Sequence, residues 1–239
     1  MDKLVMIDDK MKNYLAYWGL LLLILTACQP DDAEKPIDYR SQYIEDIAIV
    51  KSGDAWGYQN REGKLIVSPR YEMAIEFHEG LASVMAHQKW GFVDKQGQER
   101  IPLQYELVGN FSEGRALFLK NQKYGFLDKQ GEEIIPAQFQ RVEAFREGKA
   151  RVSKSGKTAY IDREGKLLIP FDYELVWKFQ QGLLKVQKNG KLGCLNEKGQ
   201  WILKPRYEDL EILPSGEIRV KDKGKIEYLA IEALKRDLE

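Results

Sequence analysis

Residue types that could do chemistry are few in this sequence and lie far apart. The two histidines, His78 and His87, have no cysteine near either of them. A metal site or a histidine-activated nucleophile needs several convergent partners, so we interpret both histidines as exposed loop or strand residues. Cys194 stands where equivalent segments carry Tyr or Phe, which indicates a small buried apolar side chain rather than a reactive thiol.

Acidic residues recur at regular intervals along the chain. Glu79, Glu113 and Glu147 each precede a glycine. They repeat by symmetry, whereas a catalytic acid pair needs two differently tuned groups in one place. The segments Asp-Lys-Gln-Gly and Asp-Arg-Glu-Gly supply one reliable carboxylate each, and calcium takes about six to eight oxygen ligands. An Asx residue followed three positions later by glycine is typical of a tight, side-chain-capped turn. The sequence therefore predicts no catalytic site, no metal site and no cofactor.

These residues belong to an internal repeat with a period of 34 residues. Five full copies are present, and a partial sixth follows. One glycine series is Gly63, Gly97, Gly131, Gly165 and Gly199, and a second is Gly80, Gly114, Gly148, Gly182 and Gly216. The apolar columns are Phe77, Phe111, Phe145, Phe179 and Leu213, then Tyr71, Tyr105, Phe139, Tyr173 and Tyr207, and finally Tyr58, Phe92, Phe126, Tyr160 and Cys194.

Each unit is predicted to be a β-meander of about three short strands. Glycine inside a helix costs about 1 kcal/mol relative to alanine, and no window without Gly and Pro accommodates two packed helices. Alternating runs at 81–85 and 90–94 flank a polar turn, and a third run at 134–136 ends in proline, which cannot donate to a sheet. One such unit cannot bury its apolar face alone, so neighbouring units must stack.

The predicted fold is therefore an all-β array of about five and a half stacked repeats. We favour an open solenoid over a closed propeller, because common propeller blades have four strands and about 40 or more residues. The closed form remains the alternative, since the first and last units are both partial and one could complete the other.

The repeat resembles the WG-repeat family of bacterial envelope proteins. The signature is present in Trp56-Gly57-Tyr58 and Trp90-Gly91-Phe92, and Tyr124-Gly125-Phe126 is close to it. It has decayed to Thr158-Ala159-Tyr160 and Leu192-Gly193-Cys194 in the fourth and fifth copies. The resemblance covers residues 44 to 229, approximately. It implies the fold, but the family has no single activity and a fold does not imply a function.

The N-terminal segment has the order of a bacterial secretory signal. Basic residues precede an apolar run and then small residues. The apolar run from Tyr14 to Ala27 is about 14 residues, fewer than the ~20 that span a bilayer as a helix. The ending Leu25-Thr26-Ala27-Cys28 resembles the lipobox of bacterial lipoproteins. That resemblance implies cleavage before Cys28 and acylation of this residue as the lipid anchor.

The chain is accordingly divided into four predicted segments. They are a lipoprotein signal peptide at 1–27 with Met11 as an alternative start, a polar tether at 28–42, the repeat domain at 43–229, and a C-terminal cap at 230–239 that forms a short helix. Asp31-Asp32 resembles the export signals of surface-displayed lipoproteins. The expected location is the cell envelope, at the surface or periplasmic face of the outer membrane.

Charge and aromatic residues narrow the choice of partner. The 37 basic and 37 acidic residues cancel, which argues against nucleic acid. The Tyr71 column is interpreted as core, although such a ladder could also stack on sugar rings or an extended peptide. Trp177 and Trp201 fall outside the columns and are the predicted ligand contacts.

These observations predict a non-enzymatic module that binds another envelope or extracellular protein as a scaffold. The alternative is a module that binds glycan or peptidoglycan through exposed aromatic residues. A purely structural spacer is a third possibility.

Overall fold

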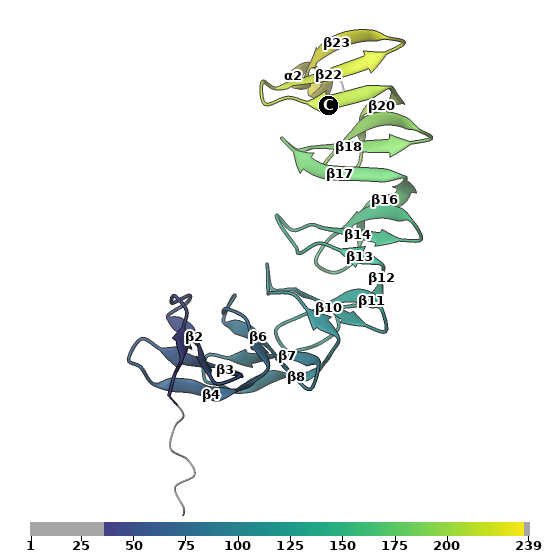
Figure 1. Cartoon of the computed structure of the whole chain (residues 1–239). Coiled ribbons are helices and arrows are strands. Elements are labelled where there is room, and N and C mark those ends of the chain that lie inside the picture. Colours follow the sequence, from purple (N-terminus) through teal and green to yellow (C-terminus); the bar gives the residue numbers. More distant parts are fainter. Residues whose placement is uncertain (1–35, 237–239) are drawn as a thin grey trace, which may run out of the picture. The chain divides into compact units, whose positions relative to one another are not determined.

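The computed structural model describes residues 36–236, and nearly every regular element in this range is a β-strand (Figure 1). The 23 described strands form six small antiparallel sheets, five with four strands and one with three. The sheets form an open array of repeats without a closed barrel, as the sequence predicted. The predicted signal peptide and Cys28 lie outside the described residues.

Each sheet consists of strands that are consecutive in the chain. The first sheet contains β1 (Tyr39–Arg40), β2 (Ile47–Ser52), β3 (Ala55–Asn60) and β4 (Leu65–Tyr71), and the second β5 (Met73–Ala74), β6 (Leu81–Ala86), β7 (Lys89–Asp94) and β8 (Glu99–Tyr105). The third contains β9 (Leu107–Val108), β10 (Ala116–Lys120), β11 (Lys123–Leu127) and β12 (Ile135–Phe139), and the fourth β13 (Arg141–Val142), β14 (Ala150–Lys154), β15 (Lys157–Ile161) and β16 (Leu167–Tyr173). The fifth contains β17 (Leu175–Gln180), β18 (Leu183–Lys188), β19 (Lys191–Asn196) and β20 (Trp201–Tyr207), and the sixth β21 (Asp209–Ile212), β22 (Glu217–Asp222) and β23 (Lys225–Ala230).

The complete sheets have four strands, not the three expected for each unit. The additional strand is the first one, and in the first four sheets it has only two residues, too few to show any alternation in the sequence. Side chains that lie next to this short strand, rather than within it, support its pairing. Glu106, for example, lies at the bend between β8 and β9, and its side chain accepts a hydrogen bond of 2.7 Å from the backbone N–H of Asn121 in the next hairpin.

The second and third strands of each sheet form a tight hairpin. At the turn between β18 and β19, Asn189 and Gly190 have φ values of 53° and 71°. Two consecutive positive φ values define a type I′ turn, whose twist matches that of the flanking strands. The Asn-Gly pair suits this turn because both residues tolerate the left-handed region.

A glycine in the third strand is required by the strand that follows. A Cβ atom on Gly91 would lie 2.4 Å from the carbonyl oxygen of Ile101 on β8, and one on Gly125 would lie 2.4 Å from that of Ile135 on β12. The pairing between these strands is irregular in each case, as in a β-bulge. This close approach explains the glycine of the Trp-Gly signature. The fourth copy carries Ala159 there, and its side chain is fully buried.

The core consists of five apolar layers, each between two consecutive sheets. Tyr58 of the first sheet packs edge-to-face on Phe77 of the second, with ring centroids 5.0 Å apart. The same pair recurs as Phe92–Phe111, Phe126–Phe145 and Tyr160–Phe179. All five members of the Tyr71 column are buried. Their interpretation as core is confirmed, and they form no exposed ladder.

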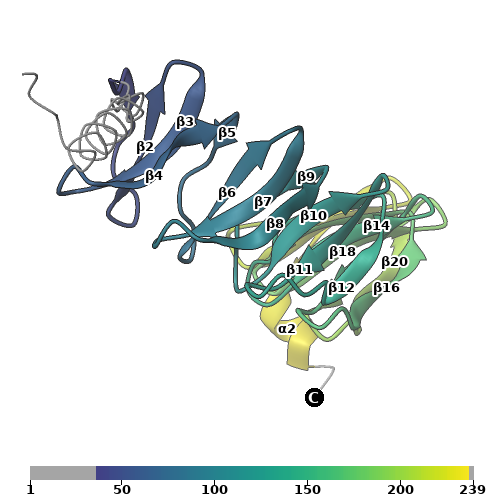
Figure 2. The ribbon, with the colours of Figure 1, turned by 90° about the horizontal axis from the view of Figure 1, so that it is seen from below.

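The ends of the array differ from its interior. The first strand begins at Tyr39, and β1 pairs with β2 through Tyr39 and Lys51, so β structure starts inside the segment expected to be tether. At the other end, α2 (Ile231–Arg236) is a short helix (Figure 2). Its Ile231 is buried in the last core layer. No helix within residues 36–236 is long and apolar enough to cross a membrane.

Candidate functional site

The two tryptophans predicted as ligand contacts have different environments. Trp201 on β20 is half-buried, and its ring packs edge-to-face on Tyr173 with centroids 5.8 Å apart. It belongs to the core between the fourth and fifth sheets. Trp177 on β17 is also half-buried, but it lines a surface hollow. Its backbone carbonyl accepts a hydrogen bond of 3.0 Å from the Tyr160 hydroxyl, which fixes its position. Trp177 therefore lines a hollow, whereas Trp201 packs against the core, and ligand contact by either residue stays a prediction.

Cys194, His78 and His87 are the residues of types that most often act in catalysis, and their environments are as follows. Cys194 is fully buried, and burial raises the pKa of its thiol to about 12. The thiolate, which is the reactive form, is thus suppressed. His87 is exposed in a hairpin turn, as predicted, whereas His78 is half-buried beside a turn.

The repeated Asx residues cap turns, as their spacing indicated. One carboxylate oxygen of Asp94 accepts hydrogen bonds of 2.9 Å from the backbone N–H groups of Gln96 and Gln98. Its second oxygen accepts a bond of 2.7 Å from Arg100. Burial acts to raise the pKa of Asp94, but these three hydrogen bonds outweigh it, so the pKa is lowered. The carboxylate is therefore committed to the turn.

The repeated Glu-Gly residues connect successive sheets. Glu79 precedes β6, and its carboxylate accepts a hydrogen bond of 3.0 Å from the backbone N–H of Gly114 in the next unit. Glu45 and Glu113 make the same bond to Gly80 and Gly148. The symmetry noted in the sequence thus reflects a structural contact between repeats.

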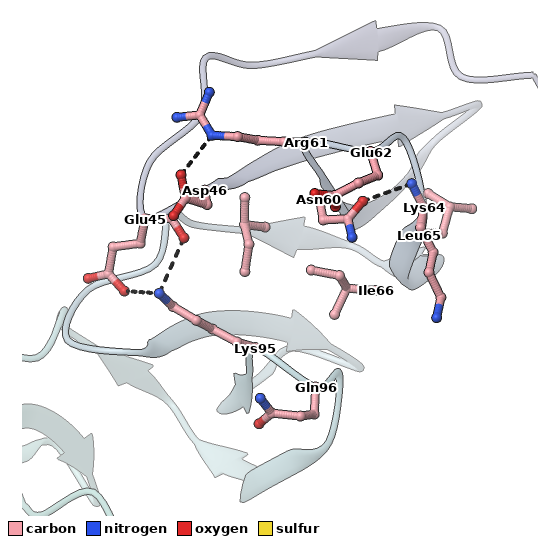
Figure 3. Close-up of a pocket in the computed structure, with 11 residues that line it drawn as sticks. Glu45, Asp46, Asn60, Arg61, Glu62, Lys64, Leu65, Ile66, Lys95 and Gln96 are labelled. Atoms are coloured by element: carbon pink, nitrogen blue, oxygen red, sulfur yellow. Dashed lines mark hydrogen bonds and ion pairs between the residues drawn. The ribbon is translucent and has the colours of Figure 1, made fainter.

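A hollow of about 790 Å³ lies beside the first sheet (Figure 3). Its charged side chains point toward one another: Arg61 lies 2.7 Å from Asp46, and Lys95 lies 3.0 Å from Glu45. The Lys95 ammonium also donates to the Glu45 carbonyl at 3.2 Å. These two pairs match four of its charges, whereas Glu62 and Lys64 also line the hollow and form no ion pair among the described residues. Lys129 and Glu79 repeat the second pair one unit later.

A second candidate lies between the fourth, fifth and sixth sheets. Three hollows of about 410, 530 and 320 Å³ all have Arg151 in their lining. We call this surface the Arg151 groove, and we define it by Glu143, Arg151, Trp177, Lys178, Lys185 and Glu211. Ligand sites typically have volumes of roughly 300 to 1,000 Å³, and these hollows fall in that range.

Charges of both signs meet in the Arg151 groove. The Arg151 guanidinium is ion-paired with Glu143 and donates a hydrogen bond of 3.1 Å to the Val176 carbonyl on β17. The Lys178 ammonium lies 4.0 Å from Glu143. The Lys185 ammonium lies over the Trp177 ring, 4.5 Å from its centroid. The groove therefore combines an aromatic ring with cations and carboxylates on a fixed backbone.

Local departures from the repeat create this groove. The strand β17 has six residues where the corresponding strands β5, β9 and β13 have two, and its pairing with β18 shifts between Val176 and Phe179. One position on the second strand of each sheet is uncharged in the first three sheets and cationic in the last three. Its occupants are Ile49, Ser83, Leu117, Arg151, Lys185 and Arg219. The sequence reasoning singled out Trp177 and missed this column, although a comparison of polar as well as aromatic columns would have found it.

The model of the WG-containing repeat matches five segments, 56–90, 90–124, 124–157, 159–191 and 193–225. The chain belongs to the WG-repeat family. In this WG-repeat protein the matched segments contain most of β3 to β22 and the whole Arg151 groove.

No curated protein matches this WG-repeat chain. Among solved structures, the Kluyveromyces lactis protein Hsv2p is similar at 14% sequence identity and a TM-score of 0.39, over 82% of this chain and 75% of that one. The extracellular domain of the putative hybrid two component system BT3049 from B. thetaiotaomicron is similar at 9% identity and a TM-score of 0.29, over 81% of this chain and 33% of that one.

Proposed function

We propose that this WG-repeat protein is a lipid-anchored protein of the bacterial cell envelope that binds another envelope or extracellular protein without catalysing a reaction. Cys28 is the proposed anchor, and the outer membrane, at its periplasmic or surface face, is the proposed location. Stacked repeats typically serve as extended binding surfaces. The proposed binding surface is the Arg151 groove.

The single observation that supports this role is the combination of Trp177 with paired charges in one groove. Tryptophan and arginine are enriched among the residues that contribute most to protein–protein binding. The backbone of Trp177 is held by Tyr160 and by its strand, and Lys185 lies over its ring, so the ring has a defined neighbour before a partner covers it. The mixture of Glu143, Arg151 and Glu211 with lysines suits a protein surface of mixed charge rather than a polyanion.

The alternative ligand, a glycan, also depends on Trp177. Sugar rings stack on open aromatic faces, and one face of the Trp177 ring is already covered by the Lys185 ammonium. This arrangement favours a protein partner, and the experiment below separates the two.

The test uses the full chain in its own envelope. A photo-cross-linking amino acid replaces Lys178, which is exposed in the Arg151 groove, and in a parallel strain it replaces Glu62, which is exposed in the hollow of Figure 3. We expect one reproducible cross-linked protein from position 178 and none from position 62. The product should disappear when Trp177→Ala is added, whereas a change at Trp201 would act through folding.

Two outcomes would contradict the proposal. The first is the absence of any protein product from position 178. The second is co-sedimentation of the detergent-solubilised full chain with peptidoglycan or insoluble polysaccharide that is lost on Trp177→Ala, which would establish the glycan alternative.

A further inference from the structure

Lys185, one cation of the Arg151 groove, differs from the residues at equivalent positions in whether a carboxylate lies next to it. Arg151, Lys185 and Arg219 occupy the same position on β14, β18 and β22. Arg151 pairs with Glu143. Arg219 donates hydrogen bonds of 3.1 Å to Glu211 and 2.7 Å to Asp209. Both arginines therefore have carboxylate partners within the chain.

Lys185 has no carboxylate within 4.0 Å among the residues that the structure describes, and its ammonium rests on the face of Trp177 at 4.5 Å. A cation held by an aromatic ring keeps its positive charge and remains able to donate hydrogen bonds, because the ring contributes only its negative face. Within residues 36–236, the ammonium of Lys185 thus has no anion next to it, whereas both equivalents do.

The space in front of this ammonium is a hollow of about 530 Å³. Its lining includes Arg151, Trp177, Lys185 and the apolar Ile212. Lys178 is 71% exposed at the rim, and its one carboxylate neighbour in the described part of the chain is Glu143, at 4.0 Å. An anionic group that enters this hollow would meet the ammonium of Lys185 directly and that of Lys178 nearby.

We propose that Lys185, held by Trp177, is the subsite of the Arg151 groove for a carboxylate, and that the carboxylate is an Asp or Glu side chain on an extended segment of the partner protein. This inference rests on the proposed function. The ammonium binds the carboxylate as a point charge with up to three donors, and the ring and Ile212 contact the apolar part of the same segment. A phosphate cluster is disfavoured, because Glu143 and Glu211 would repel a dense negative charge.

The test uses Lys185→Gln, which removes the charge and keeps a chain of similar length. The matched control is Lys225→Gln on β23, where the lysine is exposed and outside the groove. The probe is a fluorescent, C-terminally amidated Ser-Val-Glu-Val-Ser peptide with a single acidic side chain, measured by anisotropy with the full chain in detergent at low and moderate salt. We expect Lys185→Gln to weaken binding at least fivefold and Lys225→Gln to leave it unchanged.

The same variants are then compared in the cross-linking experiment at position 178. Loss of the partner with Lys185→Gln, but not with Lys225→Gln, would support the subsite. A partner captured equally by wild type and Lys185→Gln would overturn the subsite while the proposed function stands. Absence of binding by the single-Glu peptide, equal weakening by both variants, or tighter binding of polygalacturonate through Lys185 would each overturn an acidic side chain as the ligand.

Discussion

The carboxylate of Glu79 accepts a hydrogen bond of 3.0 Å from the backbone N–H of Gly114, 35 positions later in the chain. Lys129 of the same later unit lies 3.2 Å from this carboxylate. The contact therefore joins two successive sheets by a charged acceptor and a backbone donor. Glu45 and Glu113 accept equivalent hydrogen bonds. These bonds therefore help to hold each repeat against the next one.

We expect Glu79→Ala to lower the free energy of unfolding by about 1 kcal/mol, the usual contribution of a partly exposed hydrogen-bonded charge. Urea denaturation at pH 7 measures it. The matched control is Glu147→Ala, at the equivalent position, for which the described residues show no such side-chain bond to the next unit. Equal destabilisation by both changes would contradict this role of Glu79.

The same variant should show a defined pH dependence. Burial acts to raise the pKa of Glu79, but the bonds from Gly114 and Lys129 outweigh it and lower the pKa. A lowered folded-state pKa stabilises the protein above the unfolded-state value, about 4.3 for Glu, and this stabilisation is lost as the pH falls through the folded-state pKa. The stability difference between wild type and Glu79→Ala should therefore shrink below about pH 4. A difference that stays constant from pH 7 to pH 3 would disprove the assignment.

Asp94 provides a test of turn capping. Asp94→Ala leaves the N–H groups of Gln96 and Gln98 without their acceptor, and we expect a loss of about 2 kcal/mol. Asp94→Asn keeps an oxygen acceptor and should cost less than about 1 kcal/mol. Asn196 already occupies this position in the fifth unit and accepts the two equivalent bonds. Thermal and urea unfolding of the two variants should rank them in this order, and the reverse order would rule out capping.

The steric explanation for the glycine of the Trp-Gly signature can be tested by substituting alanine, which adds one carbon. In Gly91→Ala the new Cβ would lie 2.4 Å from the Ile101 carbonyl oxygen, so β7 and β8 must separate. We expect a destabilisation of about 2 kcal/mol, as for an overpacked core. The reciprocal change Ala159→Gly should cost less than about 1 kcal/mol, mainly through chain entropy. Similar unfolding midpoints for Gly91→Ala and wild type would refute the steric explanation.

The last sheet tests the same steric rule at an open edge. It lacks a fourth strand, and Ile226 and Tyr228 on β23 are 55% and 59% exposed. Glu227 stands where β3, β7, β11 and β19 carry glycine. A Cβ at those glycines would lie 2.3 to 2.8 Å from the carbonyl oxygen of the fourth strand. The side chain of Glu227 should therefore prevent a strand of the repeat type from adding to β23.

A synthetic peptide with the sequence of residues 199–207, which contains β20, measures this effect. In isothermal titration with the full chain, Glu227→Gly should bind the peptide, and wild type should not. Ala159 stands at the equivalent position of β15, which pairs with a fourth strand, so Glu227→Ala should bind the peptide more strongly than wild type but more weakly than Glu227→Gly. Binding by Glu227→Ala as strong as that by Glu227→Gly would mean that charge, not the Cβ, closes the edge.

Much of the fold could be predicted from the sequence because the same pattern of turn and core residues recurs in every repeat. The Asx-x-x-Gly turns, the core columns and the need for stacking each follow from spacing, and the family match covers the same segments. The two-residue strands β5, β9 and β13 were not predictable. They contain too few residues to show a periodic pattern. They pair because the chain passes directly from the fourth strand of one sheet to the edge of the next sheet.

The candidate site was predictable only in part. Trp177 was identified because it breaks the repeat, and Trp201 was identified for the same reason, yet Trp201 packs on Tyr173. The sequence cannot distinguish these two tryptophans, because the burial of a side chain depends on the neighbouring sheet and not on its own strand. The cationic column of Arg151, Lys185 and Arg219 could be found in the sequence from its 34-residue spacing, but only the structure shows that Arg151 and Lys185 line one groove.

The sequence by itself determined the repeat, the β class, the turns and the aromatic core, because these depend on contacts at a fixed spacing along the chain. The tertiary structure alone decided that the Glu-Gly carboxylates join successive units. It also decided that Arg151 and Arg219 receive carboxylate partners while Lys185 rests on Trp177. Such pairings arise between side chains on different strands and sheets, where their distances are set by how the sheets stack.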